Sequence, residues 1–341
     1  MKQRYDAIEA IRGLAALTVL LGHFCQMATG FQPFRVSMAV NMFFLMSGVV
    51  IARSYEERLR QGMTFGQFAT VRMIRLYPLM ALGGILGLAA TAITGKPEGD
   101  LAHMLFHQLT FIPSFWHKDL FPLNSVQWSL FFELAINFVY ALFLPRLTNR
   151  KLAVIVFLSM IYLVCDYQLT GLNFATLGWG TGWNFVGGFP LVAFYFFGGV
   201  LFYRWSLTRE APRVSVMVPI AIFAASMANV PVPNFPENPI VGIVALPVAT
   251  WLCLNTYQSA SRVAAWLGRL SFPLYALHVP PMLVAHHYWG NVMTASDLIG
   301  WFVVIASILI AAIAADRWFD EPVRAWLTKS HRMTQPARLS G

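Results

Sequence analysis

Residues 7–29 read AIEAIRGLAALTVLLGHFCQMAT. The segment is long enough to cross a bilayer, which takes about 20 residues as an α-helix. It also holds Arg12 and His23, although an ionised side chain at the centre of a bilayer costs roughly 2.5 to 10 kcal/mol or more. Such side chains are retained when they face a polar interior. The segment therefore predicts a membrane helix that lines a functional site.

The composition of the whole chain favours the same class of protein. Of 341 residues, 57% are hydrophobic and only 11% are charged, and the mean hydropathy is +0.60. Soluble proteins carry about 25% charged residues. The alternating pattern of an outer-membrane barrel is absent. The sequence predicts an all-α integral membrane protein, a polytopic bundle of about ten transmembrane helices.

Ten segments have the length and hydropathy of membrane spans. A mixed stretch, about residues 97–125, is predicted to lie in the interface or to re-enter the membrane. We predict one ten-helix domain over residues 1–327 and a short basic cytoplasmic tail over residues 328–341. The predicted spans cover about residues 7–29, 36–52, 73–94, 126–145, 152–169, 185–203, 214–230, 240–257, 266–287 and 297–316.

The distribution of basic residues predicts the orientation. With the N-terminus in the cytoplasm and ten spans, the cytoplasmic segments hold 20 of the 24 lysine and arginine residues. The outer segments hold only Arg35, Lys96 and Lys118, and Arg12 lies within the first span. Because basic loops resist translocation, this asymmetry places both termini in the cytoplasm. It also accounts for the net charge of +9 without a nucleic-acid partner.

A cleavable signal peptide is the alternative interpretation of the N-terminus. Lys2 and Arg4 precede an apolar run, and small residues follow near Ala28. Arg12 borders that run and nine further spans follow, so we expect the first helix to be retained.

Arg12 and His23 are eleven residues apart, which is close to three helical turns. They should project from nearly the same face, about 16 Å apart along the axis. Arg12 lies near the predicted cytoplasmic end, and His23 lies deeper. Taken alone, each residue also has a simpler explanation, since arginine snorkels to headgroups and a histidine can pack in a core. Together they indicate a site reached from the cytoplasm.

Arg72 and Arg75 stand at the predicted cytoplasmic start of the third span. Residues three apart are neighbours on a helix, and two guanidiniums suit a phosphate or pyrophosphate. Anchoring at the membrane surface is the alternative. Glu133, predicted on the outer side in the fourth span, has no basic neighbour in sequence, so its partner must come from another helix. His23 is the predicted partner.

Other residues have weaker signals. The small pair Ser47-Gly48 lets helices approach closely. His278, in the middle of the ninth span, is predicted to line a cavity or to pack in the core. His103 and His107 are four apart, which is compatible with a metal on a helix, but no carboxylate accompanies them. No metal site is predicted.

These motifs occur in an order typical of one family. The sequence resembles the membrane-bound acyltransferase-3 family, whose members O-acylate sugars of surface polysaccharides and related glycans. The resemblance covers about residues 5–327, and Phe272 departs from it, because tyrosine is common at that position. The motifs are Arg12-x10-His23, Phe43-Phe44…Ser47-Gly48, Arg72-x-x-Arg75, Trp128-Ser129-Leu130…Glu133, Leu270-Ser271-Phe272-Pro273-Leu274-Tyr275…His278 and Phe319-Asp320-Glu321-Pro322.

The resemblance implies the substrates and the location. Cytoplasmic acyl-CoA, acetyl-CoA by default, is the expected co-substrate, and no bound cofactor is expected. The acceptor is a hydroxyl of a cell-surface or exported glycan, or of a lipid-linked sugar. The expected location is the bacterial cytoplasmic (inner) membrane, as a multi-pass protein in contact with membrane lipids.

The resemblance also suggests roles for the ionisable residues. His23 acts as a general base or carries the acyl group as a nucleophile, and Glu133 orients its ring, as the third group of a triad does. Arg12, Arg72, Arg75 and Ser47 bind acyl-CoA, and Trp128 and His278 are candidate cavity-lining residues.

A transporter or flippase of a polar or anionic solute is the alternative class, because intramembrane charges also line permeation paths. It predicts inverted repeats, and none is seen in the sequence. It also gives no role to the paired arginines.

Overall fold

The computed structural model describes residues 5–95, 99–170, 177–209, 211–229, 237–257, 261–290 and 298–334. Within these ranges the chain is helical and contains no strand, only two isolated β-bridges. The first half forms α1 (Asp6–Thr29), α2 (Val36–Arg60), α3 (Phe65–Thr94), α4 (Leu101–Thr110), α5 (Gln127–Phe143), η1 (Leu144–Arg146) and α6 (Asn149–Thr170).

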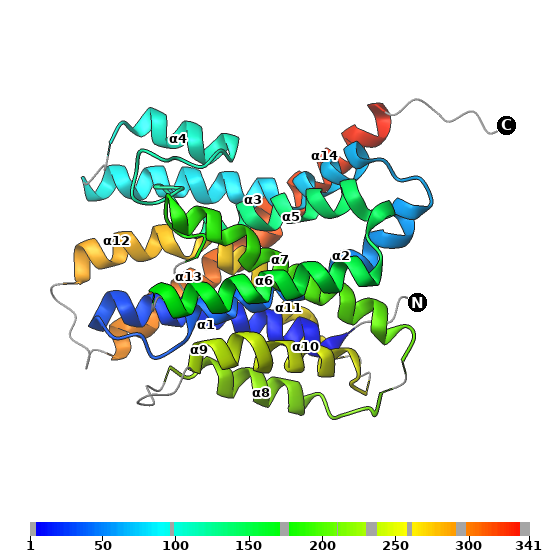
Figure 1. The fold of residues 1–341 in the computed structure, drawn as a ribbon. Helices are drawn as coiled ribbons and strands as arrows, with labels where there is room; N and C mark the ends of the chain where they lie inside the picture. Colours follow the sequence, from blue (N-terminus) through cyan, green and yellow to red (C-terminus); the bar gives the residue numbers. More distant parts are fainter. Residues whose placement is uncertain are drawn as a thin grey trace.

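The second half continues the helical bundle. It forms α7 (Trp183–Ser206), α8 (Met217–Met227), α9 (Glu237–Ile240), η2 (Val241–Ala245), α10 (Leu246–Leu254), α11 (Arg262–Leu277), α12 (Val279–Trp289), α13 (Leu298–Ala314), η3 (Ala315–Asp320) and α14 (Glu321–Thr334). The long helices run side by side (Figure 1). The start of α1 and helix α14 lie at the same end of the bundle.

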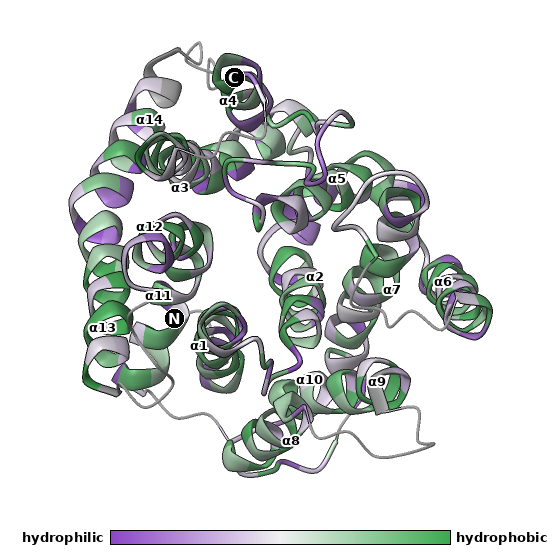
Figure 2. Cartoon of the chain, turned by 90° about the vertical axis from the view of Figure 1, so that its left-hand side faces the viewer, coloured by the Kyte–Doolittle hydropathy of each residue, from purple (hydrophilic) through white to green (hydrophobic). Residues whose placement is uncertain are grey.

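The central helices are the ones that carry most of the predicted site. Figure 2 shows α1 and α2 near the middle of the bundle, with α3, α6, α8 and α13 around them. Burial follows this arrangement. In the most apolar 18-residue stretch of α2, 72% is buried, but in the corresponding stretch of α6 only 22% is buried. The outer helices therefore present apolar side chains outward, as helices in contact with lipid do.

Seven stretches of helix in the described residues are long and apolar enough to cross a membrane. The chain is therefore a multi-pass helical membrane protein. The seven stretches are Asp6–Thr29, Val36–Arg60, Phe65–Thr94, Gln127–Arg146, Asn149–Thr170, Trp183–Ser206 and Ile299–Ser330.

The remaining three predicted spans are shorter or interrupted helices. The segment predicted at 214–230 forms only the eleven residues of α8. The apolar helix in the segment predicted at 240–257 is Val241–Leu254. The segment predicted at 266–287 is divided into α11 and α12 at His278, because Pro280 and Pro281 lack the N–H groups that would continue the ladder. The ten-span layout and the cytoplasmic termini stay predictions.

Helix α3 begins earlier than predicted. A capping box fixes its start, since the Thr64 hydroxyl accepts a hydrogen bond from the backbone of Gln67, and the Gln67 side chain accepts one from the backbone of Thr64. The helix therefore begins eight residues before the span predicted at about 73–94. Arg72 and Arg75 lie about two turns or more inside the helix, where they can face the interior of the bundle.

The stretch predicted to be interfacial contains α4. Asp100 caps its first turn by accepting a hydrogen bond from the backbone N–H of Ala102 at 3.2 Å. Helix α4 lies beside α3 (Figure 1). Its position relative to a membrane surface stays a prediction.

The predicted C-terminal tail is partly helical. Helix α13 continues through η3, a π-helical turn, into α14 without a break, and α14 extends to Thr334. Residues 335–341 of the predicted tail lie outside the described residues.

Small residues allow close helix packing, as predicted for Ser47-Gly48. A side chain at Gly48 would collide with the carbonyl of Phe196, and one at Gly199 would collide with the carbonyl of Leu45. Helices α2 and α7 therefore pack backbone against backbone.

Candidate active site

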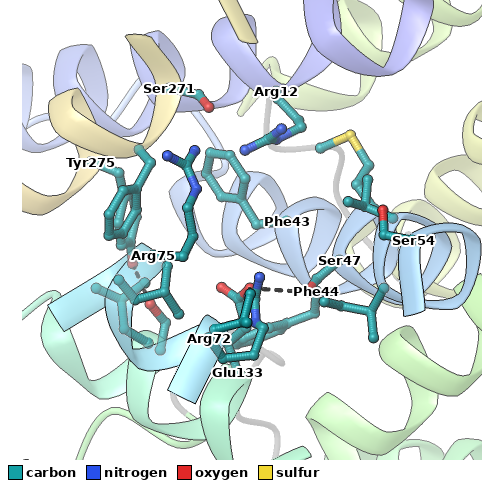
Figure 3. A pocket seen from close by; sticks show the side chains of 18 of the residues that line it. Arg12, Phe43, Phe44, Ser47, Ser54, Arg72, Arg75, Glu133, Ser271 and Tyr275 are labelled. Carbon is teal, nitrogen blue, oxygen red and sulfur yellow. Dashed lines mark hydrogen bonds and ion pairs between the residues drawn. The ribbon is translucent and has the colours of Figure 1, made fainter. Parts of the chain in front are cut away.

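A cavity of about 480 Å³ opens between α1, α2, α3, α5, α11 and α14 (Figure 3). This volume is within the range of small-molecule sites, about 300–1,000 Å³. We call it the arginine cavity because its charged lining residues are Arg12, Arg72, Arg75, Arg324 and Glu133. With four arginines and one carboxylate, its lining is suited to an anionic ligand.

Glu133 binds Arg72 and Ser47. Its Oε1 accepts a hydrogen bond from the Arg72 guanidinium at 3.1 Å and from the Ser47 hydroxyl at 2.9 Å (Figure 3). The side chains of Arg72 and Glu133 are only 10% and 18% exposed. The prediction that the partner of Glu133 comes from another helix is confirmed, but the predicted partner, His23, is wrong.

The positions of the two residues within their helices explain this difference. Arg72 lies seven residues after the start of α3, and Glu133 lies six residues after the start of α5. At about 1.5 Å per residue, each is about 10 Å inside its helix. The two side chains therefore meet within the bundle, and Glu133 belongs to the arginine cavity rather than to the side of His23.

Arg75 and Arg12 interact less with carboxylates than Arg72 does. Within the described part of the chain, Arg75 forms no ion pair, and its guanidinium carbon lies 5.8 Å from the centre of the Phe272 ring. Arg12 makes a long contact of 3.5 Å with Glu9, and both side chains are partly exposed. Both guanidiniums keep donors that a bound anion can use.

Arg324 is a cavity-lining residue that was not predicted from the sequence. It reaches the cavity from α14 and is held by Asp320 at 2.7 Å and by Asp316 at 3.9 Å. The Asp320 side chain is only 1% exposed. The spacing of Asp320 and Arg324, four residues apart on one helix face, was the available signal.

His23 and His278 form a pair outside the arginine cavity. The Nδ1 of His23 lies 3.0 Å from the Nε2 of His278, and the two rings are stacked with centroids 5.3 Å apart. His278 is 1% exposed and stands at the junction of α11 and α12. We call these two residues the histidine pair.

Phe43 and Tyr275, which we call the aromatic wall, lie next to each other at the arginine cavity. Both residues line the arginine cavity, and their rings meet edge to face with centroids 5.5 Å apart. The Tyr275 ring also lies 6.0 Å from the ring of His278. Its hydroxyl is 2.6 Å from the Ser129 hydroxyl, which fixes the ring.

Four residues singled out in the sequence lie outside the arginine cavity. They are Trp128, His278, His103 and His107. Neither Trp128 nor His278 lines the arginine cavity, and Trp128 packs against Phe44. The Nε2 atoms of His103 and His107 are 3.1 Å apart. Among the described residues, no three histidine, cysteine, aspartate or glutamate side chains are grouped to hold a metal ion.

Comparisons with known proteins identify the class and the family. The fold and the cavity define a helical membrane protein whose internal cavity carries an excess of positive charge. The chain belongs to the acyltransferase-3 family, because the model of that family, described as an acyltransferase domain, matches residues 5–317. It is therefore a membrane-bound acyltransferase.

Two relatives support this assignment. "Protein 2 in picA locus" of Rhizobium radiobacter is 33% identical over 180 residues, which cover 48% of this chain and 94% of that protein. "Putative membrane-bound transacylase BcsY" of Komagataeibacter xylinus is 26% identical over 337 residues, which cover 84% of this chain and 75% of that protein. No solved structure matches the chain.

Proposed function

We propose that the protein transfers an acyl group from acyl-CoA, bound in the arginine cavity, to a hydroxyl of a cell-surface or exported glycan. The observation that supports this most is the charge of the cavity, where four arginines face one carboxylate. CoA carries a pyrophosphate and a 3′-phosphate, and arginine is well suited to bind both. Acetyl is the acyl group expected from the family.

Arg75, Arg12 and Arg324 are the proposed phosphate ligands. Arg72 is held by Glu133, so it contributes a fixed positive charge at the cavity wall. The thin acyl-pantetheine arm would extend from the phosphates past Ser47 toward the aromatic wall. His23 lies on α1 eleven residues beyond Arg12, or about 16 Å along the axis.

His23 is the proposed catalytic residue. As a general base, it takes the proton of the acceptor hydroxyl while the oxygen attacks the thioester carbonyl. The new C–O bond forms, the C–S bond breaks, and the departing CoA thiolate takes the proton from His23. A transient acyl-histidine is the second possible route, and trapping of labelled protein after acid quench distinguishes it.

The proposed topology has ten spans and places both termini in the cytoplasm of a bacterium, with the protein in the inner membrane. The start of α1 and α14 lie at one end of the bundle, and cytoplasmic donor would enter there. The glycan, from exopolysaccharide, lipopolysaccharide or a lipid-linked sugar, would approach from the opposite side.

Purified protein in lipid nanodiscs, incubated with radiolabelled acetyl-CoA and glycan extracted from the source membrane, tests the proposal. We expect label on glycan hydroxyls with the wild type and none with His23→Ala, at equal accumulation in the membrane. Full transfer by His23→Ala would overturn the histidine mechanism. Uptake of an intact anionic solute into proteoliposomes without acyl transfer would favour the alternative class, a transporter. Membership of an acyltransferase family does not favour that class.

A further inference from the structure

The histidine pair contains a hydrogen bond whose direction follows from the backbone around it. The Nδ1 of His278 lies 2.9 Å from the carbonyl oxygen of Tyr275 and 3.2 Å from that of Leu274. Carbonyl oxygens only accept hydrogen bonds, so this Nδ1 carries a proton. In a neutral imidazole, the other nitrogen is then an acceptor.

This arrangement determines the tautomer of His23. The Nε2 of His278 accepts, so the Nδ1 of His23, at 3.0 Å, must donate. In neutral His23 the Nε2 is consequently without a proton. That nitrogen has the lone pair that a general base or a nucleophile needs.

We propose that His278 is a positioning residue that holds His23 in the tautomer with its proton on Nδ1 and its lone pair on Nε2. This role rests on the proposed function of His23. After proton transfer, the Nδ1–H of the imidazolium still points at the lone pair of His278. His278 thus does what the predicted Glu133 contact would have done.

The local fold holds His278 rigidly in this position. Pro280 cannot donate the helical hydrogen bond to the carbonyl of Ala276, and the side-chain amide of Asn124 donates to it instead, at 2.8 Å. Gly83 on α3 leaves the space for this contact, since a side chain there would collide with Asn124 and Ala276. Asn124 and Gly83 therefore hold the break between α11 and α12 in position, which keeps the His278 ring in place.

The ¹⁵N chemical shifts of histidine-labelled protein in nanodiscs, recorded without substrate, test the assignment directly. The His23 signals are identified by their loss in His23→Gln. We expect a protonated Nδ1 and a bare Nε2 in the wild type and in His278→Gln, whose amide oxygen can still accept. In His278→Leu, which cannot accept, the two tautomers should mix. His287→Leu, an exposed histidine on α12, is the matched control.

Kinetics give the second readout. We expect His278→Leu to lower kcat by at least about 10²-fold, because loss of the group that fixes a catalytic histidine can cost up to about 10⁴-fold. The KM for acyl-CoA should be unchanged, and His278→Gln should recover most of kcat. If His278→Leu fails to accumulate, His278→Phe, which also has no acceptor atom, gives the same comparison.

A proton on Nε2 of wild-type His23, or an unchanged tautomer in His278→Leu, would overturn the inference. A kcat of His278→Gln as low as that of His278→Leu would also overturn it. If the wild type shows the expected tautomer but transfers no acyl group, the proposed function fails and the tautomer assignment stands.

Discussion

Arg72 and Glu133 form an ion pair of 3.1 Å inside the bundle, although they lie 61 residues apart on helices α3 and α5. The same oxygen of Glu133 also accepts from Ser47 on α2. One carboxylate therefore joins three helices at the cavity wall. It holds Arg72 by an ion pair, whereas His278 lies beside His23.

The first prediction concerns the strength of this pair. Arg72→Ala and Glu133→Ala should each destabilise the protein by roughly 3 kcal/mol, because each leaves an unpaired charge in a mostly buried place. The double variant, Arg72→Ala with Glu133→Ala, should be at least as stable as the less stable of the two single variants. Thermal unfolding of the purified variants in detergent, read as apparent unfolding temperature, measures this. Additive losses in the double variant would show that the two side chains are not coupled.

The second prediction concerns the phosphates of the donor. Arg75→Ala should raise the KM for acyl-CoA by about 10- to 100-fold, which corresponds to one lost charge-assisted hydrogen bond of about 1.5–3 kcal/mol. The kcat should change little, since Arg75 lines the arginine cavity and neither His23 nor His278 does. Arg209→Ala, an exposed arginine beside Trp205, is the control. An unchanged KM with a lower unfolding temperature would assign Arg75 to anchoring instead.

The third prediction concerns the contribution of the C-terminal helix. Arg324→Ala should raise the donor KM by about tenfold, by the same loss of a charge-assisted hydrogen bond. Asp320→Asn should shift it in the same direction by less, because it releases Arg324 from its 2.7 Å ion pair. The exposed Lys329→Ala should have no effect. Steady-state kinetics with varied acyl-CoA measure all three, and an equal effect of Lys329→Ala would indicate a general surface charge effect.

The sequence could predict the features that follow from its apolar composition and from the free-energy cost of placing a charged side chain in a membrane. Apolar runs of helical length indicated the membrane class, and Arg12, Arg72, Arg75 and Glu133 were recognisable as charged groups within such runs or at their start. The cavity brings these four together. Their shared environment explains why the ordered motifs were a good guide to the family.

The pairing within the site could not be predicted, because it depends on where each helix begins and how helices face one another. A capping box starts α3 eight residues before the predicted span, which moves Arg72 inward to meet Glu133. Two prolines interrupt the ninth predicted span at His278 and bring that ring to His23. Arg324 lies beyond the last predicted span and reaches the cavity through the continuous helix after α13.

The last prediction concerns the length of the acyl chain. Phe43 and Tyr275 both line the arginine cavity, with ring centroids 5.5 Å apart, and the Tyr275 ring also lies 6.0 Å from that of His278. Phe43→Ala should widen the cavity beside Tyr275, so that the ratio of kcat/KM for butyryl-CoA to that for acetyl-CoA rises. Butyryl-CoA is longer than acetyl-CoA by two methylenes. In an apolar pocket, one methylene changes specificity by about 10- to 200-fold.

Phe157 on α6 is 55% exposed and does not line the arginine cavity. The variant Phe157→Ala therefore controls for a general loss of aromatic packing. Its butyryl to acetyl ratio should equal that of the wild type. Competition between the two labelled donors in one reaction gives the ratio directly and cancels differences in the amount of active protein. A ratio in Phe43→Ala no higher than in Phe157→Ala would mean that the aromatic wall does not limit the acyl chain.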